Sequence, residues 1–279
     1  MIISVASGKG GTGKTTFATN LATALGSSAQ LLDCDVEEPN AHLFLNPKID
    51  ESETIYTFVP EIDGERCSGC RKCADICRYS AITVVGGKVL VFPALCHGCG
   101  GCLEVCEDGA VMEGKREIGV LEAGQSKEAG FIHGRLRIGE AMAPPLIRAV
   151  RLKADESIDN IIDAPPGTSC PVLASMRGAD FVVLVTEPTP FGLHDLKLAV
   201  EAVKVLGIQC GLVINRADLG DDKVQEYARR EGLPILLEIP FDRKIAEAYS
   251  RGQMLVDMDG GWKDVFIGVR DRIEILAAC

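Results

Sequence analysis

Eight of the twelve cysteines fall into two matching runs whose spacing suits iron–sulfur chemistry. Each run reads C-x2-C-x2-C-x3-C. The runs are Cys67, Cys70, Cys73 and Cys77, then Cys96, Cys99, Cys102 and Cys106. At this spacing one tight loop can offer three thiolates to a four-iron cluster, while the fourth cysteine reaches a second cluster. We therefore predict two [4Fe–4S] clusters, held by Cys67, Cys70, Cys73 and Cys106 and by Cys96, Cys99, Cys102 and Cys77.

Zinc and disulfides are the alternatives for these cysteines. A zinc site needs four ligands and does not explain the repeated three-plus-one spacing. Disulfides are typical of small secreted domains, and the chain begins with an apolar run rather than a secretory leader. The runs depart from simple ferredoxins at Arg78 and Glu107, where a proline usually follows the fourth cysteine. We expect this difference to affect the helix start or the cluster potential more than the ligation.

A glycine-rich segment near the start of the chain indicates phosphate binding. Residues 8–15 match G-x4-G-K-[ST] between an expected strand over 2–6 and an expected helix over 14–25. Backbone N–H groups of such a loop cradle phosphates. Lys14 is expected to contact the β- and γ-phosphates of ATP, and Thr15 to bind Mg²⁺. The residues predicted to bind nucleotide here are Gly8, Gly10, Gly11, Thr12, Gly13, Lys14, Thr15 and Thr16.

Lys9 makes this loop resemble the deviant Walker A motif of the MinD, Mrp and nitrogenase iron protein families. The resemblance covers most of the chain outside the cysteine-rich segment. It extends to residues 33–40, 161–167, 213–216 and 239–242. The whole chain is similar to MinD-superfamily ATPases that carry an inserted ferredoxin domain.

The resemblance implies roles for three charged residues. Lys9 would reach the nucleotide of the partner subunit in a homodimer; as an alternative it is a solvated loop charge. Asp35 would position the attacking water in the switch I loop, unless it only caps a helix. Asp163 would be the Walker B carboxylate that acts on Mg²⁺ through water. A further residue, Asp33, either shares the attacking water with Asp35 or only hydrogen-bonds the loop.

The resemblance also implies roles near the γ-phosphate and the base. Gly167 would begin switch II and sense the γ-phosphate. Asn215 and Asp242 would read the adenine or its ribose; the alternatives are a turn cap for Asn215 and a helix N-cap for Asp242. Cys170, in the switch II stretch, is interpreted as a packing or redox-sensitive thiol rather than a ligand of a cluster shared between subunits.

These residues require an α/β framework. Apolar strands that alternate with helices predict a mostly parallel sheet covered on both faces, with ligands at the carboxyl ends of the strands. The expected core strands are 2–6, 30–33, 117–122, 131–138, 158–163, 181–186, 211–215 and 234–238. The expected helices are 14–25, 139–153, 194–206, 221–231, 243–251 and 262–277.

The cysteine-rich segment interrupts this framework. We predict a discontinuous P-loop ATPase domain over 1–58 and 113–279, and an inserted α+β ferredoxin-like domain over 59–112 with short strands near 82–85 and 88–92. Residues 139–145 follow no functional motif, although the proline pair in them suits the start of a helix.

Composition narrows the choice of partners. The net charge of −11 disfavours binding to a phosphate backbone, so we expect no nucleic-acid partner. The sequence contains no run of about 18 apolar residues, so we predict no membrane-spanning helix. The charges in 263–279 are balanced, unlike those of a basic membrane anchor, and we expect no stable anchor. Cysteines kept reduced favour a cytoplasmic protein.

The sequence therefore predicts an ATPase that binds and hydrolyses Mg-ATP and couples the nucleotide state to two clusters. The expected assembly is an ATP-dependent homodimer, or a heterodimer with a related ATPase. The favoured role is ATP-gated electron transfer to a redox or metal-cofactor partner protein. The alternatives are an ATPase that assembles or carries iron–sulfur clusters or a metal cofactor, and a redox-sensing, MinD-like positioning ATPase.

Overall fold

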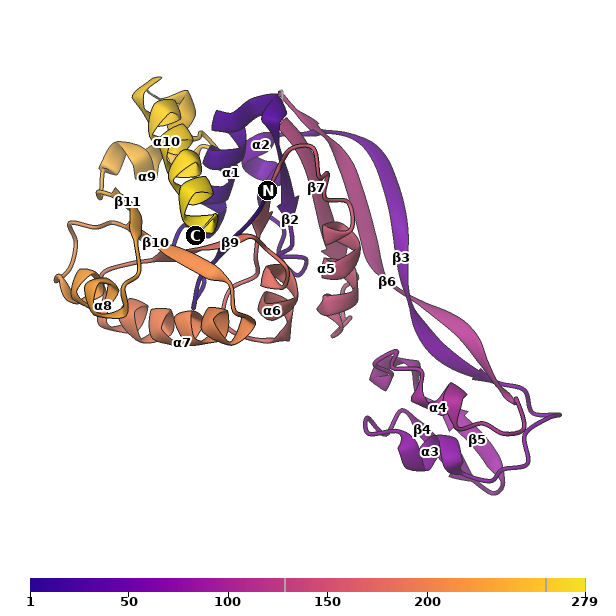
Figure 1. Cartoon of the computed structure of the whole chain (residues 1–279). Coiled ribbons are helices and arrows are strands. Elements are labelled where there is room, and N and C mark those ends of the chain that lie inside the picture. The colour runs from indigo at the N-terminus through magenta and orange to yellow at the C-terminus, as the bar shows by residue number, and fades with distance from the viewer. Residues whose placement is uncertain (128, 259, 279) are drawn as a thin grey trace.

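A computed structural model describes residues 1–127, 129–258 and 260–278. Within them, strands far apart in the sequence form a nine-stranded sheet in the order β11-β10-β9-β1-β8-β2-β7-β6-β3 (Figure 1). The strands are β1 (Ile2–Ala6), β2 (Ala29–Asp33), β3 (Lys48–Ile62), β6 (Val111–Ser126), β7 (Ala129–Leu136), β8 (Asp159–Asp163), β9 (Phe181–Thr186), β10 (Gln209–Asn215) and β11 (Ile235–Ile239). From β11 to β7 the neighbours are parallel, whereas β6 and β3 run antiparallel. The predicted α/β class with a mostly parallel sheet is confirmed.

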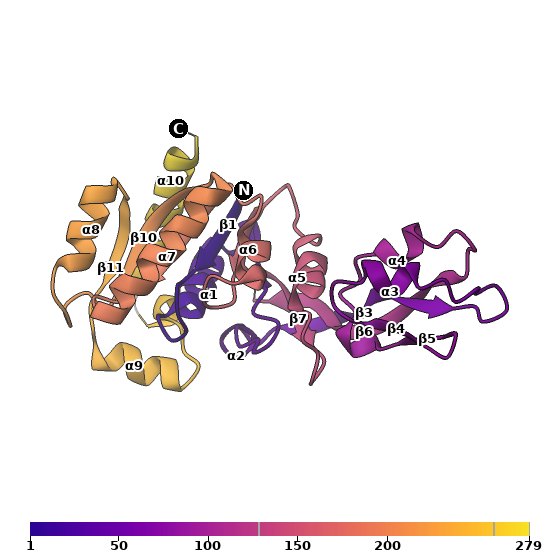
Figure 2. The ribbon, with the colours of Figure 1, turned by 90° about the horizontal axis from the view of Figure 1, so that it is seen from below.

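Helices cover both faces of the sheet, as Figure 2 shows. The helices around the sheet are α1 (Lys14–Leu25), α2 (His42–Leu45), α5 (Ala143–Arg151), α6 (Cys170–Met176), α7 (Pro190–Leu206), α8 (Lys223–Glu231), α9 (Arg243–Ser250) and α10 (Gly260–Ala277). On one face, Phe17 of α1 and Phe266 of α10 pack with Ile3 of β1. On the other face, α6, α7 and α8 pack against β9 and β10, and α5 packs against β2 and β6. Strands buried from both sides explain the continuous apolar runs in the sequence.

Most of the predicted elements are present within a few residues of their expected ends, and α1 matches its predicted range. Among the α-helices and strands that the structure describes around the sheet, β3, α2 and α6 were not predicted. Strand β3 lies at the sheet edge, and its first seven residues are exposed. Charged, exposed edge strands lack the apolar run that marks a buried strand, which explains the omission.

Strands β3 and β6 form a long antiparallel ribbon that carries the cysteine-rich segment. Their pairing continues from Lys48 opposite Gln125 to Ile62 opposite Val111. At about 3.3 Å per residue, a strand of 15 residues is roughly 45–50 Å long. Figures 1 and 2 show the intervening residues at the far end of this ribbon, away from α8 and α9. The predicted boundaries at residues 59 and 112 fall inside the paired part of the ribbon and stay a prediction.

The segment between the two ribbon strands has little regular structure of its own. It holds α3 (Lys72–Ile76), α4 (Gly101–Glu104) and the hairpin of β4 (Ile82–Val85) and β5 (Lys88–Val91). The two hairpin strands were predicted at these positions. Each short helix begins just after a cysteine-bearing loop, so the segment holds the cysteines mainly in loops and first helical turns.

Candidate nucleotide site and cysteine cavities

The glycine-rich loop joins the carboxyl end of β1 to the first residue of α1, as predicted. Gly11 and Gly13 have φ values of 77° and 97°, a region that L side chains rarely adopt. Gly8 has no room for a side chain, because a Cβ there would collide with the backbone of Asp195 in α7. The glycines therefore fix a phosphate loop against the start of a helix.

Lys14, Thr15 and Asp163 meet at the base of this loop. The Thr15 hydroxyl donates to Asp163 Oδ2 at 2.6 Å, and all three side chains are buried. Burial raises the pKa of Asp163 to about 6, although the Lys14 ammonium and the Thr15 hydrogen bond oppose the rise. Asp163 Oδ1 is buried with no hydrogen-bond partner. A buried carboxylate oxygen that lacks a partner, beside a threonine hydroxyl, fits an Mg²⁺ site.

Asp33 and Asp35 shape the loop after β2. Asp33 accepts hydrogen bonds from the N–H groups of Asp35 and Ala41, both at 3.1 Å. Of its two predicted roles, the geometry therefore favours holding the loop. Burial raises the pKa of Asp35 to about 6, and the Lys14 ammonium counteracts this rise. The charge of Lys14 is thus felt at Asp35, and a shared role at the nucleotide site stays a prediction.

Lys9 faces an acidic residue of its own chain. Its Nζ lies 3.4 Å from Glu187 Oε2, just after β9, and Arg216 Nη1 lies 2.9 Å from the other carboxylate oxygen. The Glu187 side chain is 10% exposed, so both cations approach a largely buried carboxylate. Sequence reasoning missed Glu187, because no motif marks it.

Two other predicted residues, Asn215 and Gly167, contact the loop or the residue before it, whereas Asp242 caps a helix. Asn215 Nδ2 donates to the carbonyl of Thr12 at 2.9 Å, so it holds the phosphate loop from the end of β10. Gly167 has φ of 98° and donates its N–H to Ser7. Asp242 accepts from the N–H of Lys244 and caps α9, which is the alternative role considered for it. Contact of Asn215 or Asp242 with a base stays a prediction.

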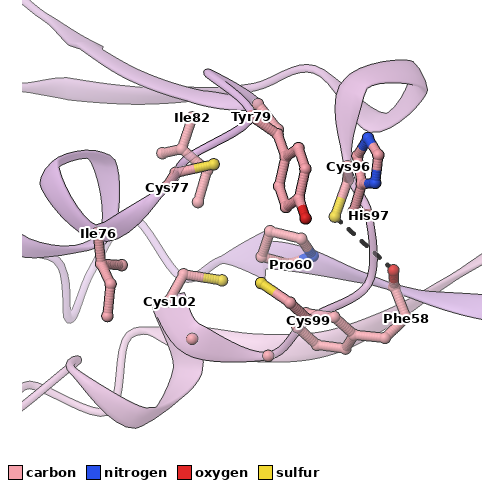
Figure 3. A pocket seen from close by; sticks show the side chains of 13 residues that line it. Phe58, Pro60, Ile76, Cys77, Tyr79, Ile82, Cys96, His97, Cys99 and Cys102 are labelled. Carbon is pink, nitrogen blue, oxygen red and sulfur yellow. Dashed lines mark hydrogen bonds between the residues drawn. The ribbon is translucent and has the colours of Figure 1, made fainter. Parts of the chain in front are cut away.

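The eight cysteines of the two runs line two cavities at the end of the ribbon. A cavity of about 70 Å³ is lined by Cys77, Cys96, Cys99 and Cys102. Figure 3 shows these four thiols with Tyr79 and His97, whose rings stack with centroids 3.6 Å apart. A second cavity of about 20 Å³ is lined by Cys67, Cys70, Cys73 and Cys106. These are the same two sets of four that the sequence spacing groups together.

The cysteines of each set line a shared cavity but do not form a closed metal site among the described residues. Among the described residues, no three side chains of His, Cys, Asp or Glu are placed closely enough to hold a metal ion. The eight cysteines are free thiols. Burial raises the pKa of Cys102 to about 11, and the nearby Cys96 and Cys99 add to the rise. Four thiols around one cavity are a donor set that suits iron–sulfur clusters or zinc.

The surroundings of the two cavities differ. Aromatic and apolar side chains such as Phe58, Tyr79 and Ile76 line the larger one, whereas Arg71, Lys72 and Asp108 line the smaller one. Cys170 lies outside both cavities and is exposed at the start of α6. Nothing in its position links it to either set of four.

Fold and phosphate loop together define a P-loop nucleotide-binding protein. The chain belongs to the CobQ/CobB/MinD/ParA nucleotide-binding domain family, whose model matches residues 3–256. It is 30% identical over 265 residues to the uncharacterized protein MJ0579 of Methanocaldococcus jannaschii, covering 91% of this chain and 90% of that one.

Two further relatives carry informative names. An iron-sulfur cluster carrier protein of Aquifex aeolicus is 27% identical over 273 residues, which are 91% of this chain and 61% of that protein. The fold matches the septum site-determining protein MinD of Pyrococcus horikoshii, solved with Mg-ADP, with a TM-score of 0.58 at 23% identity. That match covers 99% of this chain and 96% of the other. No helix in the described residues is long and apolar enough to cross a membrane.

Proposed function

We propose that this protein is a dimerising Mg-ATPase whose inserted segment, residues 59–112, binds two [4Fe–4S] clusters and exchanges electrons with a partner protein under the control of the nucleotide. The observation that carries the proposal is the grouping of eight cysteines into two sets of four around two cavities, in a chain that also has a P-loop. The ribbon of β3 and β6 joins the two parts.

At the nucleotide site, this chain supplies the groups that bind and orient ATP. Lys14 and the loop amides bind the phosphates, while Thr15 would bind Mg²⁺ and Asp163 would act on it through water. Asp35 orients the water that attacks the γ-phosphate, since it is half-buried and lies near Lys14. In the dimer, Lys9 leaves Glu187 and reaches the nucleotide of the partner subunit.

At the cysteine cavities, each set of four thiolates would hold one cluster. Bound clusters supply one-electron storage at the end of the ribbon. The larger cavity is bordered by the exposed ring of Tyr79, which is 44% accessible, so this side of the segment is open to a protein partner. Cys67, Cys70, Cys73 and Cys106 would hold the second cluster beside Arg71 and Lys72.

The proposal is tested on protein purified without oxygen. We expect iron and acid-labile sulfide in equal amounts, about eight of each per chain for two [4Fe–4S] clusters. We also expect ATP hydrolysis that needs Mg²⁺ and differs between the oxidised and the dithionite-reduced protein. Protein that contains zinc instead of iron, or that lacks ATPase activity in both states, would contradict the proposal.

A second candidate function is delivery of clusters or a metal cofactor to a client protein. The relative named as an iron-sulfur cluster carrier supports it. Between Gly211 and Ala278, however, the sequence has no cysteine, and carriers of the Mrp type use a C-x-x-C pair near the C-terminus. Incubation with an apo-ferredoxin separates the two functions. ATP-dependent loss of iron to the apo-ferredoxin favours delivery, whereas electron transfer without loss of iron favours the relay.

A further inference from the structure

A buried arginine connects the larger cysteine cavity to the ATPase core. Arg116 of β6 pairs through Nη1 with the carboxylate of Glu140 and donates through Nη2 to the carbonyl of Cys96 at 3.2 Å. The arginine side chain is 10% exposed and the glutamate side chain 1%. On the opposite strand, the carbonyl of Phe58 accepts a hydrogen bond from the Cys96 thiol at 3.8 Å (Figure 3). The backbone carbonyl of Cys96 is therefore held by Arg116, which Glu140 holds in turn.

Glu140 belongs to the loop between β7 and α5, residues 137–142, which overlaps the stretch 139–145 that follows no functional motif. Its Oε1 accepts from the N–H of Met142 at 2.9 Å, and its own N–H donates to the carbonyl of Arg137 at 2.9 Å. The N–H of Arg137 in turn donates to the carbonyl of Ile118 in β6. These bonds fix the carboxylate, so a movement of the loop would carry Arg116 with it.

The other end of this loop is joined to switch I. The N–H of Leu136, the last residue of β7, donates to the carbonyl of Val36 at 2.8 Å. Val36 directly follows Asp35 and is 1% exposed. At Gly134, a Cβ would come within 2.8 Å of the Val36 side chain, so strand and loop pack without a gap. A shift of Asp35 therefore acts on the end of β7 through a single backbone hydrogen bond.

We propose that the contacts from Val36 through Leu136, Glu140 and Arg116 to Cys96 transmit the nucleotide state from switch I to the larger cysteine cavity, with Arg116 as the positioning residue. This inference rests on the proposed function and adds the residues through which the nucleotide site acts on the larger cysteine cavity. The alternative route follows the chain through β3, whose first seven residues are exposed. The proposed route runs through hydrogen bonds, and its ion pair of Arg116 and Glu140 is largely buried.

The test compares Arg116→Met and Glu140→Gln with Arg148→Met, which removes an exposed arginine on α5 outside the route. Hydrogen–deuterium exchange of peptides over 93–101 is measured in the anaerobic protein with Mg-ADP and with a non-hydrolysable ATP analogue. In the wild type and in Arg148→Met, exchange in this segment should differ between the two nucleotides by at least about fivefold in protection, the lower end of ordinary allosteric coupling. In Arg116→Met and Glu140→Gln this difference should disappear while nucleotide affinity stays unchanged.

A second measurement does not depend on the backbone. The midpoint potential of the protein-bound iron should shift between the two nucleotides in the wild type by at least about 40 mV, which is a fivefold change at about 59 mV per tenfold. The shift should be lost in Arg116→Met and Glu140→Gln and partly kept in Arg116→Lys. Variants that keep the wild-type response in both measurements would overturn this route and leave the proposed function intact. A wild-type protein that shows no response to the nucleotide in either measurement would overturn both the route and the proposed function. A protein that contains no iron but still shows the exchange response would overturn the proposed function alone.

Discussion

Lys9 and Glu187 form an ion pair within one chain, with 3.4 Å between Nζ and Oε2. The family resemblance implies that Lys9 reaches the nucleotide of the partner subunit in a dimer. In the single chain, Lys9 is instead paired with a glutamate of its own subunit. Arg216 shares the same carboxylate. Dimer formation would have to break the Lys9 contact, so Glu187 sets part of the free-energy cost of closure.

We therefore expect Glu187→Gln to favour the ATP-bound dimer. A partly exposed ion pair contributes about 0.2–1 kcal/mol, and a homodimer breaks two such pairs, so the association constant should rise about 2- to 30-fold. Analytical ultracentrifugation with a non-hydrolysable ATP analogue measures this constant. Glu247→Gln, which removes an exposed pair with Arg243 on α9, serves as the control and should leave it unchanged. A weaker dimer in Glu187→Gln would show that Glu187 supports the closed state instead.

The buried carboxylate of Asp163 makes stability depend on pH. Its folded-state pKa is raised to about 6 by burial, so the folded protein binds more protons than the unfolded chain between about pH 4 and pH 6. In metal-free protein the free energy of unfolding should fall as the pH rises through this window and then level off. Asp33 and Asp35, whose pKa values are also raised, act in the same direction.

Asp163→Asn should reduce this slope and make the metal-free protein more stable at pH 7.5 by about 1–3 kcal/mol, because it removes a buried charge that lacks one hydrogen-bond partner. Urea unfolding in EDTA at pH 5 and pH 7.5 measures the effect. The same variant should lose Mg-dependent ATP hydrolysis. An Asp163→Asn protein with an unchanged slope and full activity would remove this residue from the metal site.

Because there is no space for a side chain at Gly8, adding one methyl group there should lower both ATP affinity and stability. In Gly8→Ala, the new Cβ would collide with the backbone of Asp195, so the phosphate loop must shift. We expect ATP affinity to fall at least about tenfold and stability to fall by about 1–3 kcal/mol. Titration with a fluorescent ATP analogue tests this. Gly64→Ala, where no atom lies within 4 Å of the added Cβ, is the matched control and should bind ATP normally.

The grouping of the cysteines predicts which thiols share a cluster. Cys102→Ser should lose the iron of the larger cavity alone, which reduces the iron content from about eight to about four per chain. The control, Cys170→Ser, changes an exposed thiol outside both cavities and should keep the full content. Iron analysis, together with EPR spectra of the reduced proteins, measures how many clusters each variant keeps. Equal iron in Cys102→Ser and wild type would refute this assignment of ligands.

Residues at the ends of apolar strands could be located from the sequence, because a parallel sheet gathers such ends at one edge. Lys14, Thr15 and Asp163 do meet there. The two sets of four cysteines could also be predicted from the spacing. In this pattern the fourth cysteine of each run joins the first three cysteines of the other run.

The contacts that join these sites could not be predicted. Arg116, Glu140 and Glu187 meet their partners only through tertiary packing, and no local pattern marks them. Strand β3 was missed for a related reason. Its residues are mostly exposed, and it is a strand because β6 pairs with it along its whole length. Pairing of this kind depends on the partner strand more than on the strand's own composition.

Under the proposed function, nucleotide binding would change the redox potential of the two clusters. The most direct measurement is an EPR-monitored redox titration of anaerobically purified wild-type protein with Mg-ADP and with a non-hydrolysable ATP analogue. Coupling of ordinary strength, about 5- to 150-fold, predicts that the midpoint potential differs by about 40–130 mV between the two nucleotides. Identical potentials, together with identical rates of electron transfer to an acceptor protein, would contradict the account.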